Sequence, residues 1–121
     1  MNKRDKRVFI KILKYCGEIA ETHKIFNEDK AVYDDDVKGI PYRNSIAMDI
    51  LQIGELANHL TDEMLKAHKD IPWSEIVGMR NIAAHHYDEW DYERAWNTSQ
   101  QDVPELAKKI QEILDTDKDA Q

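Results

Sequence analysis

Gly78-Met79-Arg80-Asn81-Ile82-Ala83-Ala84-His85-His86-Tyr87 places strongly polar side chains among small and apolar ones. The surrounding region otherwise has the pattern of a core helix. Polar side chains such as those of Arg80, Asn81 and His85 are not needed in a helix that only packs a core. These residues therefore mark a candidate functional site.

The spacing of Arg80, Asn81 and His85 resembles the signature of HEPN domains, in which an Arg, a polar residue, three positions and a His form a ribonuclease active site. Tyr87 extends the match to the HepT-like branch, whose pattern is Arg, four residues, His, one residue, Tyr. Flanking landmarks carry the resemblance over about residues 40 to 114: Ile53-Gly54-Glu55, Ile71-Pro72-Trp73 and Asp102-Val103-Pro104-Glu105-Leu106.

The resemblance implies a metal-independent endoribonuclease that acts on RNA without a cofactor, with Arg80 and His85 as catalytic residues and Asn81 supporting them. It also implies a homodimer with composite sites and a role as the toxin of a toxin–antitoxin pair. The expected antitoxin is a minimal nucleotidyltransferase that transfers AMP to Tyr87 and so neutralises the toxin.

The residue types fit this chemistry. His85, with an ordinary pKa near 6.5, can move protons, and Arg80 can hold phosphate oxygens by charge-assisted hydrogen bonds. Asn81 can orient His85 or bind ribose or phosphate. His86 makes the identity of the proton donor ambiguous. In the alternative interpretation, Arg80 forms an ion pair with an acidic neighbour and His85 caps a helix end.

Length and composition suit one helical domain. The 121 residues predict a single HEPN-like domain over residues 1–115 and a frayed polar tail over residues 116–121. Cys16 is the lone cysteine, and no Cys/His cluster has zinc spacing. No apolar run reaches the roughly 20 residues of a membrane span, and no signal peptide pattern is present. We expect a cytoplasmic protein.

The net charge of −7 argues against a general nucleic-acid binder, but the charge is uneven. Residues 1–14 carry six cations against Asp5, a local charge of +5 that leaves −12 for the remainder. A solvated helix face is the simpler interpretation. However, cations near a helix N-terminus oppose the macrodipole, and this placement is consistent with a phosphate-bearing partner.

Hydrophobic periodicity predicts an all-α fold, an antiparallel bundle of four main helices with one or two short extra helices. The expected long helices cover residues 3–26, 40–60, 73–87 and 102–115, and a shorter one covers 92–101. Asn27 and Thr61 are candidate N-caps of short helices. Gly54 inside the second long helix indicates that another helix crosses closely there.

An unbroken α-helix over residues 73–87 separates Arg80 and His85 by about 140° around its axis. Two such groups converge on one phosphate only if the Arg bends round or a second copy completes the site. Ala83-Ala84 would let a facing helix approach, so we expect a two-fold dimer through the motif-bearing side.

Several other residues favour structural roles. We expect Cys16 and His23 in the core, and the aspartates at 34–36 in a solvated connection rather than a metal site. Trp73, Trp90 and Trp96 can stack on bases but are expected to pack the bundle or the dimer seam.

The leading function is thus a toxin ribonuclease. One rival is a non-catalytic helical protein that binds nucleotide or presents substrate to a nucleotidyltransferase, with Arg80 only gripping phosphate. A second rival is a purely structural dimerisation module.

Overall fold

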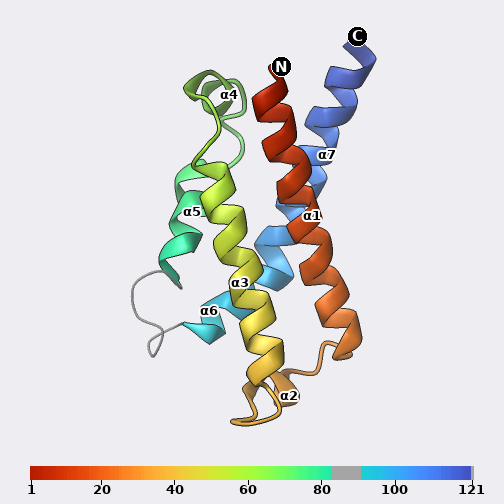
Figure 1. The fold of residues 1–121 in the computed structure, drawn as a ribbon, viewed down its shortest axis with the longest axis vertical. Helices are drawn as coiled ribbons and strands as arrows, with labels where there is room; N and C mark the ends of the chain where they lie inside the picture. Colours follow the sequence, from red (N-terminus) through yellow and green to blue (C-terminus); the bar gives the residue numbers. More distant parts are fainter. Residues whose placement is uncertain (83–90, 121) are drawn as a thin grey trace.

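The computed structural model describes residues 1–82 and 91–120, and all regular secondary structure in that part of the chain is helical. Three long helices, α1 (Lys3–Ile25), α3 (Ile40–Ala57) and α7 (Val103–Ala120), form the bundle together with a fourth segment made of α5 and η1 (Figure 1). The shorter elements are α2 (Lys30–Asp34), α4 (Asp62–Ala67), α5 (Trp73–Gly78), the 3₁₀ turn η1 (Met79–Ile82), α6 (Tyr92–Asn97) and the π-helical turn η3 (Thr98–Asp102). The predicted all-α bundle is confirmed.

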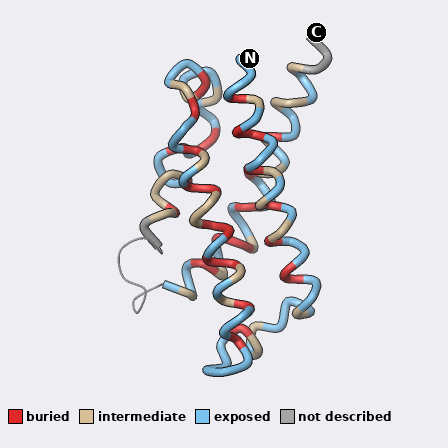
Figure 2. The backbone as a smooth tube through the Cα atoms, in the orientation of Figure 1, coloured by how far each residue is buried: buried red, intermediate tan, exposed pale blue. Residues whose placement is uncertain are grey.

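The first long helix begins at the predicted residue. The side-chain oxygen of Asn2 caps α1 by accepting a 2.7 Å hydrogen bond from the backbone N–H of Asp5. Phe9, Ile12 and Ile19 are buried on one stripe of the helix. Figure 2 shows buried and exposed positions recurring along each long helix, as this pattern requires.

The second long helix starts as predicted after Gly39, with Pro41 in its first turn. Ile46, Ile50 and Ile53 are completely buried in the core. The α-helix ends at Ala57, before the predicted residue 60, and Thr61 then opens α4. Thr61 Oγ1 caps α4 by accepting a 3.2 Å bond from the N–H of Met64, which confirms the predicted cap.

His23 joins three elements at the centre of the bundle. Ser99 Oγ donates to the carbonyl oxygen of Trp96 at 2.7 Å, so His23 Nε2 must donate to Ser99 Oγ at 2.9 Å. His23 Nδ1 is then left to accept from the hydroxyl of Tyr42. Burial lowers the pKa of His23, in agreement with this neutral tautomer. The predicted core role of His23 is confirmed, and Cys16 is also buried.

The C-terminal part of the chain departs from the prediction. We expected separate helices over residues 92–101 and 102–115, but α6, η3 and α7 follow one another without a break. Pro104 has no N–H for an ordinary helical bond, and its ring would press on the carbonyl four residues back. The wider π-turn relieves this conflict, because the N–H of Val103 donates to Thr98 O, five residues back.

One other local expectation is wrong. Asn27 has a left-handed backbone (φ 56°) and follows the end of α1, so Asp29 rather than Asn27 caps α2. Residues 116–120 extend α7, and the fraying expected of this polar tail stays a prediction. Gln121 lies outside the described residues. Within the described ranges, no helix combines the length and apolarity needed to cross a membrane.

The contact between α1 and α3 contains one buried carboxyl. Asp49 on α3 is only 8% exposed. Its burial and its hydrogen bond to Glu18 on α1 raise its pKa to about 7, against a smaller opposing effect of Lys14. Folded protein therefore holds a proton on Asp49 at a pH where the unfolded chain has released it.

This proton makes stability depend on pH. The contribution of Asp49 to stability should fall as pH rises from about 4, the ordinary pKa of Asp, to about 7, and then level off. In Asp49→Asn, an uncharged amide donor replaces the carboxyl beside Glu18, and this donor does not lose a proton as pH rises. The substitution should therefore raise the melting temperature more at pH 8 than at pH 5. Circular dichroism melts of this variant and of Asp36→Asn, at an exposed position, measure the effect. An equal change at both pH values would contradict it.

Candidate active site

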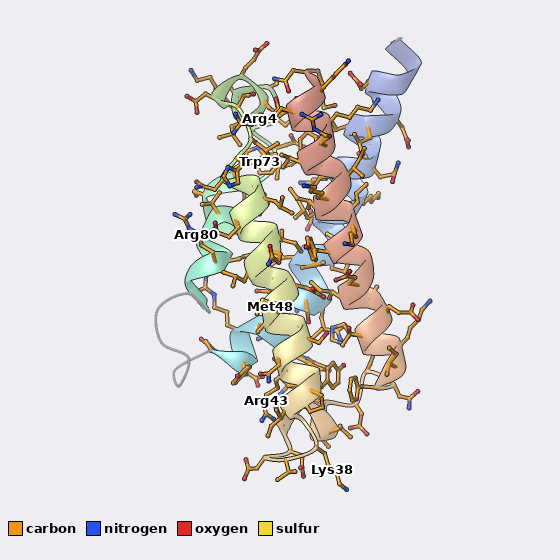
Figure 3. The ribbon with its side chains drawn as sticks, viewed as in Figure 1. Arg4, Lys38, Arg43, Met48, Trp73 and Arg80 are labelled. Atoms are coloured by element: carbon orange, nitrogen blue, oxygen red, sulfur yellow. The ribbon has the colours of Figure 1, made fainter. Side chains whose placement is uncertain are left out.

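Arg80 lies on η1, the 3₁₀ turn that directly follows α5. The preceding residue, Met79, is 5% exposed and belongs to the core, as does Ile76 of α5. A residue next to a buried anchor on a tight turn has little freedom to shift. The backbone of Arg80 is therefore fixed by the core, while its side chain reaches the surface (Figure 3).

Gly54 of α3 is what lets this turn approach. A Cβ added at Gly54 would come within 2.8 Å of the backbone nitrogen of Arg80 and 3.2 Å of its Cβ, and within 3.1 Å of the carbonyl oxygen of Ile76. The first of these distances is too short for any real side chain. The predicted close crossing at Gly54 is confirmed, and the residue that Gly54 contacts is Arg80, a candidate catalytic residue.

The guanidinium of Arg80 has one weak ionic partner in the described part of the chain. Its Nη1 lies 3.8 Å from Oε1 of Glu55, and the two side chains are 35% and 48% exposed. A partly exposed pair at this distance contributes less than about 1 kcal/mol. The ion pair of the alternative interpretation is thus present, but it leaves the guanidinium accessible to a phosphate.

The expected α-helix over residues 73–87 is only partly confirmed. It begins at Trp73 as predicted, but its α-helical part ends at Gly78, a poor helix former, and continues as η1. A 3₁₀ turn has about three residues per turn. The angle of about 140° between Arg80 and His85, which assumed α-helical geometry throughout, therefore does not apply.

The structure describes only some of the other motif residues. The backbone of Asn81 belongs to η1. His85, His86 and Tyr87 lie outside the described residues, as do the Ala83-Ala84 pair and Trp90.

Residues 83–90 join two ends that are both held by the bundle. On the far side, Tyr33 Oη donates to the carbonyl oxygen of Tyr92 at 2.7 Å, and the Arg43 guanidinium lies 5.3 Å from the centre of the Tyr92 ring. Lys30 adds a 2.7 Å ion pair with Glu93. These anchors leave no signal in the sequence, because the contacts join residues about 50 to 60 positions apart and follow no periodic pattern.

The two tryptophans in the described part of the chain, Trp73 and Trp96, pack against the bundle and do not present a free ring face for a base. Trp73 is 8% exposed and its Nε1 donates to the carbonyl oxygen of His68. Trp96 lies edge-on to His23, with ring centres 5.2 Å apart. The expected packing role is confirmed for both residues.

The aspartates at positions 34–36 are exposed, in line with the expected solvated connection. Asp35 accepts hydrogen bonds from the N–H groups of Val37 and Lys38, which lower its pKa and close the turn. Over residues 1–82 and 91–120, no three His, Cys, Asp or Glu residues are grouped to hold a metal ion.

Comparison with known proteins decides the family. The model of the family described as "Ribonuclease HepT-like" matches residues 12–113. The chain belongs to the HepT-like family. It is 30% identical over 112 residues to a Methanocaldococcus jannaschii protein named "Putative RNase", covering 92% of this chain and 98% of that protein.

Two further relatives agree. A Caldanaerobacter subterraneus protein with the same description is 34% identical over 91 residues, or 68% of this chain and 81% of that protein. A "Probable ribonuclease HepT" of Thermococcus cleftensis is 31% identical over 61 residues, or 50% and 56% of the two chains. No solved structure matches this chain.

Gly54→Ala tests the contact that holds Arg80. The added methyl must push η1 away from α3, so it should cost about 1–3 kcal/mol of stability and lower any activity that depends on Arg80. Gly17→Ala is the matched control, because a Cβ there meets nothing within 4 Å on exposed α1 and should stabilise the helix by about 1 kcal/mol. Urea unfolding of both variants measures the difference. If Gly54→Ala were as stable as Gly17→Ala, the described contact would be wrong.

Proposed function

We propose that this chain is a metal-independent endoribonuclease, the toxin of a toxin–antitoxin pair. The observation that carries the proposal is the placement of Arg80, whose backbone is wedged against Gly54 and whose guanidinium is accessible and weakly paired. Membership of a family described by ribonuclease function supports the reaction. The position of His85, five residues after Arg80, supplies the second catalytic group.

In the proposed reaction, the 2′-hydroxyl of the substrate ribose attacks the adjacent phosphorus. The new 2′-O–P bond forms as the P–O5′ bond breaks, which gives a 2′,3′-cyclic phosphate and a 5′-hydroxyl end. One proton leaves the 2′-oxygen and one reaches the 5′-oxygen, and His85 serves these transfers. Arg80 stabilises the negative charge that develops on the phosphoryl oxygens, and Asn81 orients His85 or binds ribose or phosphate.

We further propose that the active unit is a homodimer whose two motifs line one cleft. A single copy brings one Arg80 to the surface beside α3, and a two-fold partner would supply a second. Sedimentation equilibrium measures this state directly. A monomer that retains full activity would contradict the composite site.

Neutralisation is proposed to occur at Tyr87, where a nucleotidyltransferase antitoxin attaches AMP. The phenolic oxygen attacks the α-phosphorus of ATP, pyrophosphate leaves, and the phenol proton passes to solvent. The adduct adds a negative phosphodiester and a purine close in sequence to Arg80. Both would oppose the approach of an RNA phosphate.

Loss of either catalytic group should abolish cleavage. Arg80→Ala and His85→Ala should each lower the rate by about 100-fold or more, because each removes charge stabilisation or proton transfer in the transition state. Arg94→Ala, at an exposed arginine on α6, is the control that should retain activity. The assay is cleavage of labelled RNA by pure protein in EDTA, with the cyclic phosphate end identified by mass. Full activity of His85→Ala, or loss of all cleavage in EDTA, would exclude this mechanism.

Tyr87→Phe separates modification from catalysis. The variant keeps the ring but has no acceptor oxygen, so it should remain toxic and gain no AMP when supplied with the antitoxin and ATP. Tyr92→Phe, at the start of α6, should still gain the mass of AMP and be silenced. Intact-mass spectrometry and growth measurements read both effects. Silencing of Tyr87→Phe with the same mass gain would place the acceptor at another residue.

The rival function, a non-catalytic protein in which Arg80 only grips phosphate, predicts a different pattern. Nucleotide binding would then depend on Arg80, while pure protein would cleave no RNA at any concentration. The same labelled RNA assay, combined with nucleotide binding, distinguishes the two functions.

A further inference from the structure

A groove of about 300 Å³ lies between α1 and α3, away from the contact of α3 with η1. Its lining residues come from α1, from α3 and from the turn that follows α3: Arg4, Arg7, Val8, Lys11, Leu56 and His59. Arg4, Arg7 and Lys11 of α1 form its cationic wall. Val8 and Leu56 supply apolar surface between the charged side chains. The groove thus combines cations and a shallow apolar floor, with the His59 imidazole as a further polar group.

The three cations follow one face of α1. Arg4, Arg7 and Lys11 are separated by three and four residues, the spacing that stacks side chains along a helix, and Lys14 continues the same stripe. All four residues are exposed. At 1.5 Å per residue, the stripe is about 15 Å long. It is a linear array of positive charge rather than a compact cluster.

Arg4, Arg7 and Lys11 make no ion pair with the described residues that would stabilise the fold. No carboxylate of the described residues lies in ion-pair distance of Arg4, Arg7 or Lys11. Asp5, the one acidic residue among them in sequence, is buried and accepts bonds from the backbone N–H and the hydroxyl of Thr61. Cations in the first turns of a helix also oppose its macrodipole. Mutual repulsion adds to this cost, and a polyanionic partner would offset it.

The groove and Arg80 lie on two sides of the same helix. Gly54 faces η1 and Leu56 lines the groove, and these residues are about 200° apart around α3. Glu55, about 100° from Gly54 on α3, and His59, in the turn after α3, are both exposed. The separation is about the 10 Å diameter of a helix, a distance that a single RNA strand can span. Figure 3 labels Arg4 on α1 and Arg80 beside α3.

We propose that the α1–α3 groove binds the sugar–phosphate backbone of the RNA strand whose scissile phosphate is held at Arg80. This inference rests on the proposed ribonuclease function. The guanidinium groups of Arg4 and Arg7 and the ammonium of Lys11 pair with successive phosphates, and no base edge is read, so binding is independent of sequence. Residues 15–121 carry a net charge of −12 and repel a polyanion, whereas residues 1–14, which hold the cations of the groove, carry +5 and attract it.

An acidic protein surface could also pair with these cations, but RNA fits the geometry better. A polymer held at Arg80 must continue over neighbouring surface, and the groove lies one helix width away. The charges also form a line along α1. Glu55, between the groove and Arg80, opposes the strand, but its 3.8 Å contact with Arg80 is weak enough to be displaced by phosphate.

The test uses a 2′-O-methyl RNA oligonucleotide, which has no attacking hydroxyl and stays intact. Binding to wild type is compared with that of Arg4→Gln/Arg7→Gln/Lys11→Gln over a range of salt concentrations. Three lost phosphate contacts should reduce the slope of log affinity against log salt by about 2 and weaken binding at least tenfold at 0.1 M salt. The variant should melt no lower than wild type, because it relieves the unfavourable charge at the helix N-terminus.

Two controls separate the groove from charge in general. Arg4→Lys/Arg7→Lys/Lys11→Arg keeps every charge and should bind like wild type. Lys24→Gln/Lys38→Gln/Lys108→Gln makes the same change in net charge at exposed residues outside the groove and should keep the wild-type slope. The proposal would be overturned if Arg4→Gln/Arg7→Gln/Lys11→Gln bound RNA with the affinity and salt slope of wild type. It would also be overturned if this variant lost the binding of an acidic protein but bound RNA unchanged.

The outcome is independent of catalysis. If wild type binds the oligonucleotide through the groove but cleaves no RNA, the ribonuclease function fails and the binding site stands. If wild type cleaves RNA but the groove variant binds and cleaves equally well, the function stands and the groove proposal fails.

Discussion

The close contact between α3 and η1 at Gly54 is the constraint on which the site depends. A Cβ at position 54 would meet the backbone of Arg80 and Ile76, so no side chain can occupy it without moving the turn. The loss of backbone freedom on folding makes a glycine in mid-helix unfavourable by about 1 kcal/mol. In return, the core holds the backbone of Arg80 against α3 while its guanidinium stays accessible beside Glu55.

The rest of the bundle fixes the two ends of the motif segment. Met79 ties one end to the core, and the contacts of Tyr33 and Arg43 with Tyr92 tie the other. Behind α6, the hydrogen bonds from Tyr42 through His23 to Ser99 connect α3, α1 and η3. Because these polar groups satisfy one another in a buried place, removing any one would leave an unpaired donor or acceptor. The fold therefore acts as a frame for residues 80–91.

The sequence predicts the long elements well, because apolar periodicity and caps are local signals. The start of α1, Pro41 in the first turn of α3 and the Thr61 cap all follow from such signals, and Gly54 predicted a close crossing. Where tertiary packing decides, the local signals fail. The last helix was expected to begin at residue 102, yet Pro104 lies in a continuous helical run that widens into a π-turn just before it.

The candidate site shows the same division. The motif and its resemblance identify Arg80, but neither indicates that α5 ends at Gly78 or that Glu55 lies 3.8 Å from the guanidinium. Glu55 was noted only as part of the Ile53-Gly54-Glu55 landmark, since an ion pair between residues 25 positions apart leaves no periodic trace. The basic residues of α1 were visible as a local charge of +5, but only the fold places them in one groove with His59.

A double-mutant cycle on Gly54 and Arg80 tests the central claim most directly. Affinity for an uncleavable 2′-O-methyl RNA is measured for wild type, Gly54→Ala, Arg80→Ala and the double variant. If Gly54 acts by placing Arg80, Gly54→Ala weakens binding in the wild-type background and has no further effect once Arg80 is alanine. Equal losses in both backgrounds would show that the two residues act independently and would contradict the account.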